Sequence, residues 1–215
     1  MAGLPINIPI PAESSVASYD WTEVASGEGY VTFDGFASVT STATDYHMSN
    51  NVLGTGSQTY AVDTSSTASI DFDTTPFNSP RYVQGNALIA FTHAIFASAA
   101  GGGKTNAITV AVYHYDGSTE TSLGTATCEA LTSVANQLVK ATRQFVIPLT
   151  PKHFKIGDIL RIKVTVAWAG GEGNYVHAFC CDPLNRDITG LYSHTLTAST
   201  NPTKFQVAIP FKIQL

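Results

Sequence analysis

Apolar and polar residues alternate with a period of two along most of the chain beyond Trp21. Even positions of residues 160–168 are apolar, and odd positions of residues 205–215 share one apolar face. Because successive side chains of a β-strand point to opposite faces, this alternation predicts half-buried strands. Seven other segments bounded by turn residues also have strand character: 30–38, 70–73, 87–97, 108–115, 122–128, 139–149 and 175–181.

This density of strands predicts an all-β fold, an antiparallel β-sandwich whose expected connectivity is a jelly roll. Asp116-Gly117-Ser118 is a turn signal that joins its two flanking strands as a hairpin. The one competing helical pattern lies in residues 129–139. No repeat of fixed period occurs, and residues 21–215 are expected to form a single domain.

Two of the expected strands have unusual features. Residues 86–99 are apolar on both faces, which indicates either a central strand or one whose outer face meets a partner. Pro210 interrupts the last strand, and because proline has no N–H, that strand is expected to lie at an edge or to be broken there.

Residues 1–20 differ from the rest and are expected to form an extended arm. Prolines at 5, 9 and 11 stand between aliphatic residues, and proline excludes a central strand. The aliphatic side chains need a surface, either the parent domain or a neighbouring subunit. The expected partner-binding residues of the arm are Leu4, Pro5, Ile6, Ile8, Pro9 and Ile10.

Composition narrows the functional classes. Only 13% of residues are charged, against roughly 25% in an average soluble domain. The 11 Lys and Arg residues form no cluster and the net charge is −5, which argues against nucleic-acid binding. No signal peptide and no membrane-spanning apolar run is expected. Cys180 and Cys181 are expected to be buried and unbridged.

The glycine-rich stretch 101–105 resembles part of a phosphate-binding loop but lacks two of its requirements. Ser98 stands where the first glycine belongs, and a strand pattern follows where a helix must begin. We therefore expect a turn between strands, with Lys104 as an exposed surface contact.

Other candidate chemistry is sparse. Asp71 and Asp73 share a strand face, suited to glycoside hydrolysis or calcium, but alternation alone explains them. The loop oxygens of Asp182, Asn185 and Asp187 could hold a cation without EF-hand spacing. His177 and Cys180 offer two zinc ligands without a second pair. No nucleophile motif occurs, so we expect neither an enzyme nor a cofactor.

Tyr113 and Tyr115 fall out of phase with the apolar positions of their strand. They are therefore expected on its outer face. Rings in that position either stack on sugars or contact another subunit.

Three stretches resemble structural proteins of tailed-bacteriophage virions: "TDYHMSNNVL" (44–53), "LTPKHFKIGDILRIKVTV" (149–166) and "CDPLNRD" (181–187). The proline-punctuated arm and the Ser/Thr/Ala-rich sandwich fit the same group. The resemblance implies a capsid decoration or cement protein with a jelly-roll fold, often trimeric. It would be made in the host cytoplasm and bind the major capsid protein or other virion subunits. The alternative is a carbohydrate-binding sandwich, as a separate module or as part of a phage adhesin or tail.

Overall fold

The computed structural model describes residues 28–39, 44–51, 59–62, 68–98, 103–169, 175–191 and 194–212, and they contain strands and no helix. The expected arm lies outside these residues. The strands are β1 (Glu28–Val39), β2 (Thr44–Ser49), β3 (Thr59–Val62), β4 (Ala68–Asp73), β5 (Arg81–Ala97), β6 (Thr105–Tyr115), β7 (Glu120–Thr127), β8 (Leu131–Thr132), β9 (Leu138–Phe154), β10 (Ile159–Ala169), β11 (Tyr175–Cys180), β12 (Ile188–Leu191), β13 (His194–Leu196) and β14 (Phe205–Lys212).

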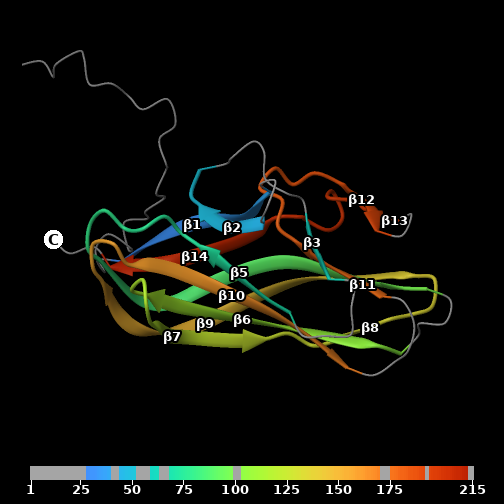
Figure 1. Ribbon diagram of the computed structural model, residues 1–215, viewed down its shortest axis with the longest axis horizontal. Coiled ribbons are helices and arrows are strands. Elements are labelled where there is room, and N and C mark those ends of the chain that lie inside the picture. The colour runs from blue at the N-terminus through green and yellow to red at the C-terminus, as the bar shows by residue number, and fades with distance from the viewer. Residues whose placement is uncertain are drawn as a thin grey trace, which may run out of the picture.

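Eight of these strands form two facing layers (Figure 1). One layer has the order β1-β14-β5-β9, and the other has the order β4-β10-β6-β7. Counted along the chain as strands one to eight, these orders are 1-8-3-6 and 2-7-4-5, the double Greek key of a jelly roll. The expected all-β antiparallel sandwich with jelly-roll connectivity is confirmed.

The main core fills the space between the two layers. Strand alternation turns the even residues of β4, β6 and β10 and the odd residues of β5 and β14 inward. Four buried phenylalanines meet at its centre: the ring centroids of Phe72 and Phe205 are 4.9 Å apart, those of Phe91 and Phe179 are 5.1 Å apart, and Phe179 lies 5.1 Å from Phe205. Offset and edge-on contacts of this kind add to the burial of apolar area.

The long strand β5 is shared by three neighbours. β9 pairs with it along one edge, while β14 and β11 divide the other edge between them. β3 extends the sheet beyond β11, and the β12–β13 hairpin covers the outer side of β5 and β11 at one end of the molecule (Figure 1). That cover makes a second small core of Ala94, Ala178, Cys180, Ile188, Leu191 and Leu196.

The two layers meet along both sides. On one side β2 pairs with β4 in parallel through His47 and Asp73. On the other side β7 packs against β9 so closely that a Cβ built on Gly124 would lie 2.6 Å from the carbonyl oxygen of Pro148. The close approach at this side of the sandwich therefore requires a glycine at position 124.

Most sequence-based expectations for the fold are confirmed. All nine predicted strands form, and β6 and β7 make the expected hairpin, with the Asp116 carboxylate accepting hydrogen bonds from the N–H groups of Ser118 and Thr119. All three cysteines are free and buried. The helical alternative for residues 129–139 is wrong: that stretch holds β8, a turn and the start of β9.

The structure also decides the two open questions about strand position. β14 is a central strand, so the edge alternative for Pro210 is wrong; the pairing of β14 with β5 is interrupted at this point, while its pairing with β1 continues through Pro210. The β14–β5 register shifts between Ala208 and Phe211, where Gly85 takes a φ of 118°. The missing N–H of Pro210 is accommodated by this irregularity. β5 is central as well, and among the described residues the β12–β13 hairpin covers its outer face at one end. No helix of the described residues is long and apolar enough to cross a membrane.

Candidate functional site

The glycine-rich turn places Lys104 in the interior, which corrects the expectation of an exposed contact. Only 5% of Lys104 is exposed. Its ammonium lies 4.6 Å from the ring centroid of Tyr175 and 5.4 Å from that of Trp168. Its backbone N–H donates to the hydroxyl of Ser133 and its carbonyl accepts from the Ser133 N–H, at 2.9 and 2.7 Å. These bonds fix the backbone of Lys104 beside the end of β8. The Lys104 ammonium is thereby held next to two aromatic rings, and cation–π attraction compensates for its lost contact with water.

Tyr113 and Tyr115 stand on the outer face of β6, as alternation predicts, but cations from β10 lie over them. The guanidinium carbon of Arg161 is 4.2 Å from the Tyr115 ring centroid. The ammonium of Lys163 is 5.1 Å from the Tyr113 ring centroid. A sugar stacking on these rings would have to compete with the cations, so the two tyrosines are a poor stacking platform.

The same cations hold three carboxylates in one network. Arg161 forms a bidentate pair with Asp73, 2.7 Å for each bond, and reaches Glu120 at 2.6 Å and Asp71 at 3.3 Å. Lys163 lies 2.6 Å from Glu120 and 3.7 Å from Asp71. We call these five residues the charged face. Its carboxylates are neutralised within the sheet, so Asp71 and Asp73 are not a simple solvated pair.

The network shifts the pKa of its members in opposite directions. Hydrogen bonds from Lys163 and Arg161 lower the pKa of Glu120, and the bond to Glu120 raises the pKa of Lys163. Burial raises the pKa of Asp71 despite the neighbouring cations. Glu120 is therefore the more strongly stabilised anion of the two.

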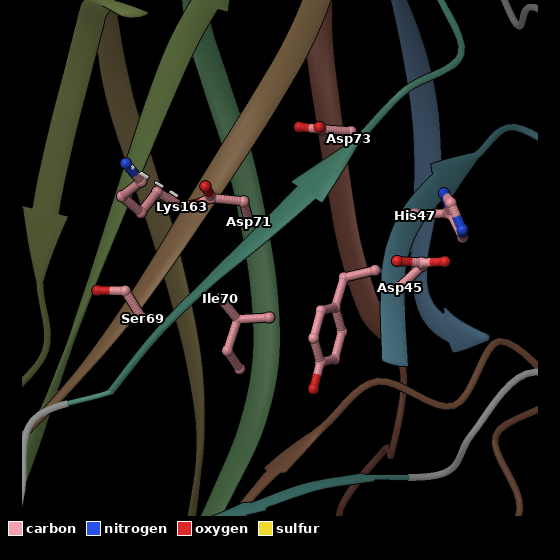
Figure 2. Close-up of a pocket in the computed structure, with 8 residues that line it drawn as sticks. Asp45, His47, Ser69, Ile70, Asp71, Asp73 and Lys163 are labelled. Atoms are coloured by element: carbon pink, nitrogen blue, oxygen red, sulfur yellow. Dashed lines mark ion pairs between the residues drawn. The ribbon is translucent and has the colours of Figure 1, made fainter. Parts of the chain in front are cut away.

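A groove of about 430 Å³ opens beside the charged face, where β2 and β4 separate from their single paired position. Figure 2 shows Asp45 and His47 on β2, Ser69, Asp71 and Asp73 on β4, and Lys163 on β10. Tyr46 and Ile70 complete the lining. Carboxylates, a hydroxyl and an imidazole beside a tyrosine suit a ligand rich in hydroxyl groups. Sequence reasoning missed this groove because β2 was not predicted.

The loop oxygens proposed for a cation are used inside the protein. Asp182 is fully buried, and its carboxylate accepts hydrogen bonds from the guanidinium of Arg186 at 2.8 and 3.1 Å. The side-chain oxygen of Asn185 accepts from the Thr203 N–H, and that of Asp187 accepts from the Ala198 N–H, both at 2.8 Å. In the part of the chain described by the structure, no three His, Cys, Asp or Glu residues are placed to hold a metal ion.

His177 and Cys180 do not form a pair of ligands, because residues three apart on a strand face opposite sides. Cys180 belongs to the second small core, while His177 faces the main core. There its ring centroid lies 5.9 Å from that of His93 and 5.8 Å from that of Trp168. Both imidazoles are fully buried, and neither ring nitrogen of His177 has a hydrogen-bond partner.

Burial keeps both imidazoles neutral. It lowers the pKa of His177 to about 3, aided by His93, and the pKa of His93 to about 4, aided by the charge of Arg143. The Arg143 Nε–H donates to Nε2 of His93 at 3.4 Å, so the His93 proton is on Nδ1, which has no partner. Sequence alternation could have indicated this burial, since His93 is in phase with Phe91 and Ile95.

The outer side of β1, β14, β5 and β9 differs from the charged face. We define the uncharged face as Thr32, Leu88, Ala90, Gln144, Val146, Pro148, Gln206 and Ala208. Strand pairing aligns Thr32, Ala208, Leu88 and Val146 in one row across the four strands. Leu88 is 43% exposed and Val146 is 63% exposed. Asp34 continues the next row, Gln206, Ala90 and Gln144, at the β1 end; its carboxylate accepts a hydrogen bond from the Gln206 amide at 3.1 Å and lies 3.8 Å from Lys204, so one ion pair stands at this end of the face. The arm residues lie outside the described residues, so their contacts remain a prediction.

No protein-family model and no curated protein matches the chain. Among solved structures, an α-amino acid ester hydrolase is similar with a TM-score of 0.50 at 9% identity, over 83% of this chain. A CocE/NonD family hydrolase from Staphylococcus aureus has a TM-score of 0.46 at 9% identity over 86% of the chain, and an infectious bursal disease virus Gt strain chain has 0.32 at 10% identity over 100%. The chain spans 36%, 37% and 41% of these three structures.

The first of these similarities shows a shared fold and corrects one expectation. The absence of catalytic motifs led us to expect that the chain is not an enzyme. That expectation is overturned, because a chain of similar fold is part of an ester hydrolase. The missing motifs therefore do not exclude an enzyme. At 9% identity no catalytic residue can be carried over from that enzyme.

Proposed function

We propose that the chain is a structural subunit of a virus particle, of the capsid decoration or cement kind. In this proposal it binds the major capsid protein or other virion subunits, acts as a trimer or another homo-oligomer, and resides on the capsid surface. The arm and the uncharged face are its contact elements.

The uncharged face carries this proposal. Surfaces that associate with other proteins have cores depleted of charge, and Leu88 and Val146 expose aliphatic side chains side by side on β5 and β9 of the four-stranded layer. A jelly roll supports the same reading, since this architecture is common in viral capsid domains, although it also occurs in lectins. Many weak contacts repeated around a shell would add up through avidity.

Copurification with assembled particles tests the proposal. The protein is expected at a fixed copy number per particle, and deletion of residues 1–14 is expected to abolish attachment while leaving a folded domain. Absence from purified particles would contradict a virion role, and full occupancy by the deletion variant would remove the arm from it. Measurement of the size of the free protein in solution tests the trimer.

The groove favours a second candidate, carbohydrate binding. Its exposed Asp45 and His47 and the Ser69 hydroxyl are suited to hydrogen bonds with sugar hydroxyls. A glycan array should then show saturable binding that is lost in D45A and H47A. The variants T121A and S122A, at exposed positions of β7 that do not line the groove, are the controls, and equal losses in all four would exclude the groove.

A further inference from the structure

The uncharged face is the exposed continuation of a surface that the chain partly covers. Around Ala94 the outer side of β5 lies under β12 and β13. The cover ends near Thr92, whose hydroxyl lies 2.9 Å from that of Thr142. Leu88, four residues further along β5, is exposed beside Val146, its partner in register on β9.

The N-terminal segment has a pattern that matches such a face. Leu4, Ile6, Ile8 and Ile10 occupy even positions, and every proline between residues 4 and 12 occupies an odd one. In an extended chain the even side chains share one face. The N–H groups that the prolines at odd positions lack would all point to one edge of the segment. Such a segment can bury one apolar face, and the edge that carries the prolines cannot pair fully with another strand.

Charge selects between the two outer faces of the sandwich. Residues 1–12 carry no charged side chain, and Glu13 is the first. Covering the charged face with this segment would remove the Arg161 and Lys163 network from water without supplying new partners, which is unfavourable. Covering the part of the uncharged face around Leu88 and Val146 removes these two side chains from water and leaves the single ion pair, Asp34–Lys204, at the far β1 end.

The segment is long enough to reach the face. Residues 11–27 connect it to β1, and these 17 residues span about 60 Å when extended. β1 itself carries Thr32 of the uncharged face four residues after its start at Glu28. The same length permits docking on the chain's own face or on that of a second copy.

We propose that residues 4–10 dock in an extended form on the uncharged face, with Leu88 and Val146 at the centre of the contact. This inference rests on the proposed function, which makes the arm a contact element, and adds the surface that receives it. In attachment to a particle, the uncharged face would then be the surface that receives the N-terminal segment.

Disulfide trapping in the full-length protein tests this contact. The double variant I8C/V146C is oxidised with diamide and compared with I8C/S122C, in which Ser122 lies exposed on β7 of the other layer. The native cysteines are buried and should not compete. The first pair is expected to cross-link about tenfold faster or more, because docking raises the local concentration of the two thiols. Equal rates for the two pairs would overturn the proposal.

A third variant separates docking from accidental collision. L88D in the I8C/V146C background should slow cross-linking to the rate of the control pair, while the far-ultraviolet circular dichroism spectrum shows that the strands remain folded. A cross-linked product of monomer size indicates docking within one chain, one of dimer size indicates exchange between copies, and each supports the contact. Unchanged trapping in the L88D variant would contradict it.

The trapping experiment is performed without particles. Failure to cross-link together with normal copurification would therefore overturn this inference and leave the virion role intact. Cross-linking by a protein that is absent from particles would do the reverse.

Discussion

The two outer faces of the sandwich solve the same problem in opposite ways. The charged face satisfies its groups internally: Arg161 and Lys163 lie between Asp71, Asp73 and Glu120 and above two tyrosine rings. The uncharged face has a single ion pair at its β1 end, Asp34–Lys204, and leaves Leu88 and Val146 in water. Covering charged groups that are already paired gives a binding partner little free energy, because their desolvation is costly. Covering exposed aliphatic groups is favourable. The comparison indicates which side of the molecule is available for assembly.

Lowering the pH is expected to have the largest effect on stability, and it acts mainly on the layer of the uncharged face. His93 and His177 lie beneath the sheet of the uncharged face, with pKa values lowered to about 4 and about 3. Because the unfolded state binds these protons first, their stabilising contribution is complete above about pH 6.5 and falls as the pH drops toward 4. The loss is on the order of 3 kcal/mol for each group. Urea unfolding between pH 7 and pH 4 measures it.

His177→Leu is the matched variant, since it keeps the volume and removes two unpartnered nitrogens. It should retain its stability at pH 7 and lose much of the slope between pH 6.5 and 4. An unchanged slope would show that the buried imidazoles are not responsible. The lowered pKa of Glu120 on the charged face acts in a different window, with its contribution lost as the pH falls below 4.5.

Breaking the charged face should cost about 2 kcal/mol. Arg161→Met removes hydrogen bonds to Asp73 and Glu120 and leaves three carboxylates facing one another. Lys163→Met removes one short ion pair and should cost less. Denaturant midpoints at low and high salt measure both effects. If the two variants were equally stable, Arg161 would contribute no more to the network than Lys163 does.

Separating the layers at the β7–β9 side should cost about 1–2 kcal/mol. Gly124→Ala places a methyl group 2.6 Å from a backbone oxygen of Pro148 and 2.8 Å from the side chain of Ile147, so the strands must move apart. Ser122→Ala, at an exposed position of the same strand, is the control. Thermal unfolding compares them, and a stable Gly124→Ala protein would mean that the two layers tolerate a wider spacing.

Polar substitution of the uncharged face should have the smallest effect on stability. The double variant L88S/V146S is expected to unfold within about 0.5 kcal/mol of the parent if residues 4–10 dock on a second copy, because both side chains are exposed on the strands. If residues 4–10 dock on their own chain, the variant loses the docking energy in addition. In either case particle occupancy is expected to fall. A large loss of stability in the isolated protein would show that the chain already covers this face strongly.

Much of the fold could be predicted because the long strands carry their own signal. β5, β6, β9, β10 and β14 alternate over enough residues for their period to be read locally. The short strands β3, β12 and β13 were not predicted, since their three or four residues are strands only through their pairing partners. The jelly-roll order follows from the fold class rather than from any single motif.

The site was less accessible to sequence reasoning. The environment of Lys104 depends on Trp168 and Tyr175, which are distant in sequence, so a glycine-rich turn was read as exposed. The groove depends on β2, whose pairing with β4 is limited to one position. In contrast, the outward direction of Tyr113 and Tyr115 followed from alternation, although the cations above them did not.

The pairing of β1 with β14 has a mechanical consequence. Glu28, where the first strand begins, pairs with Lys212, where the last one ends, so tension between these two points pulls the strands apart from that end. Hydrogen bonds between antiparallel strands lie perpendicular to them, and under this load they break one after another rather than all together. A subunit pulled through both ends would peel open at low force. Anchorage that leaves the Lys212 end of β14 free avoids that path, because the Glu28–Lys212 end of the β1–β14 pair is then not pulled apart.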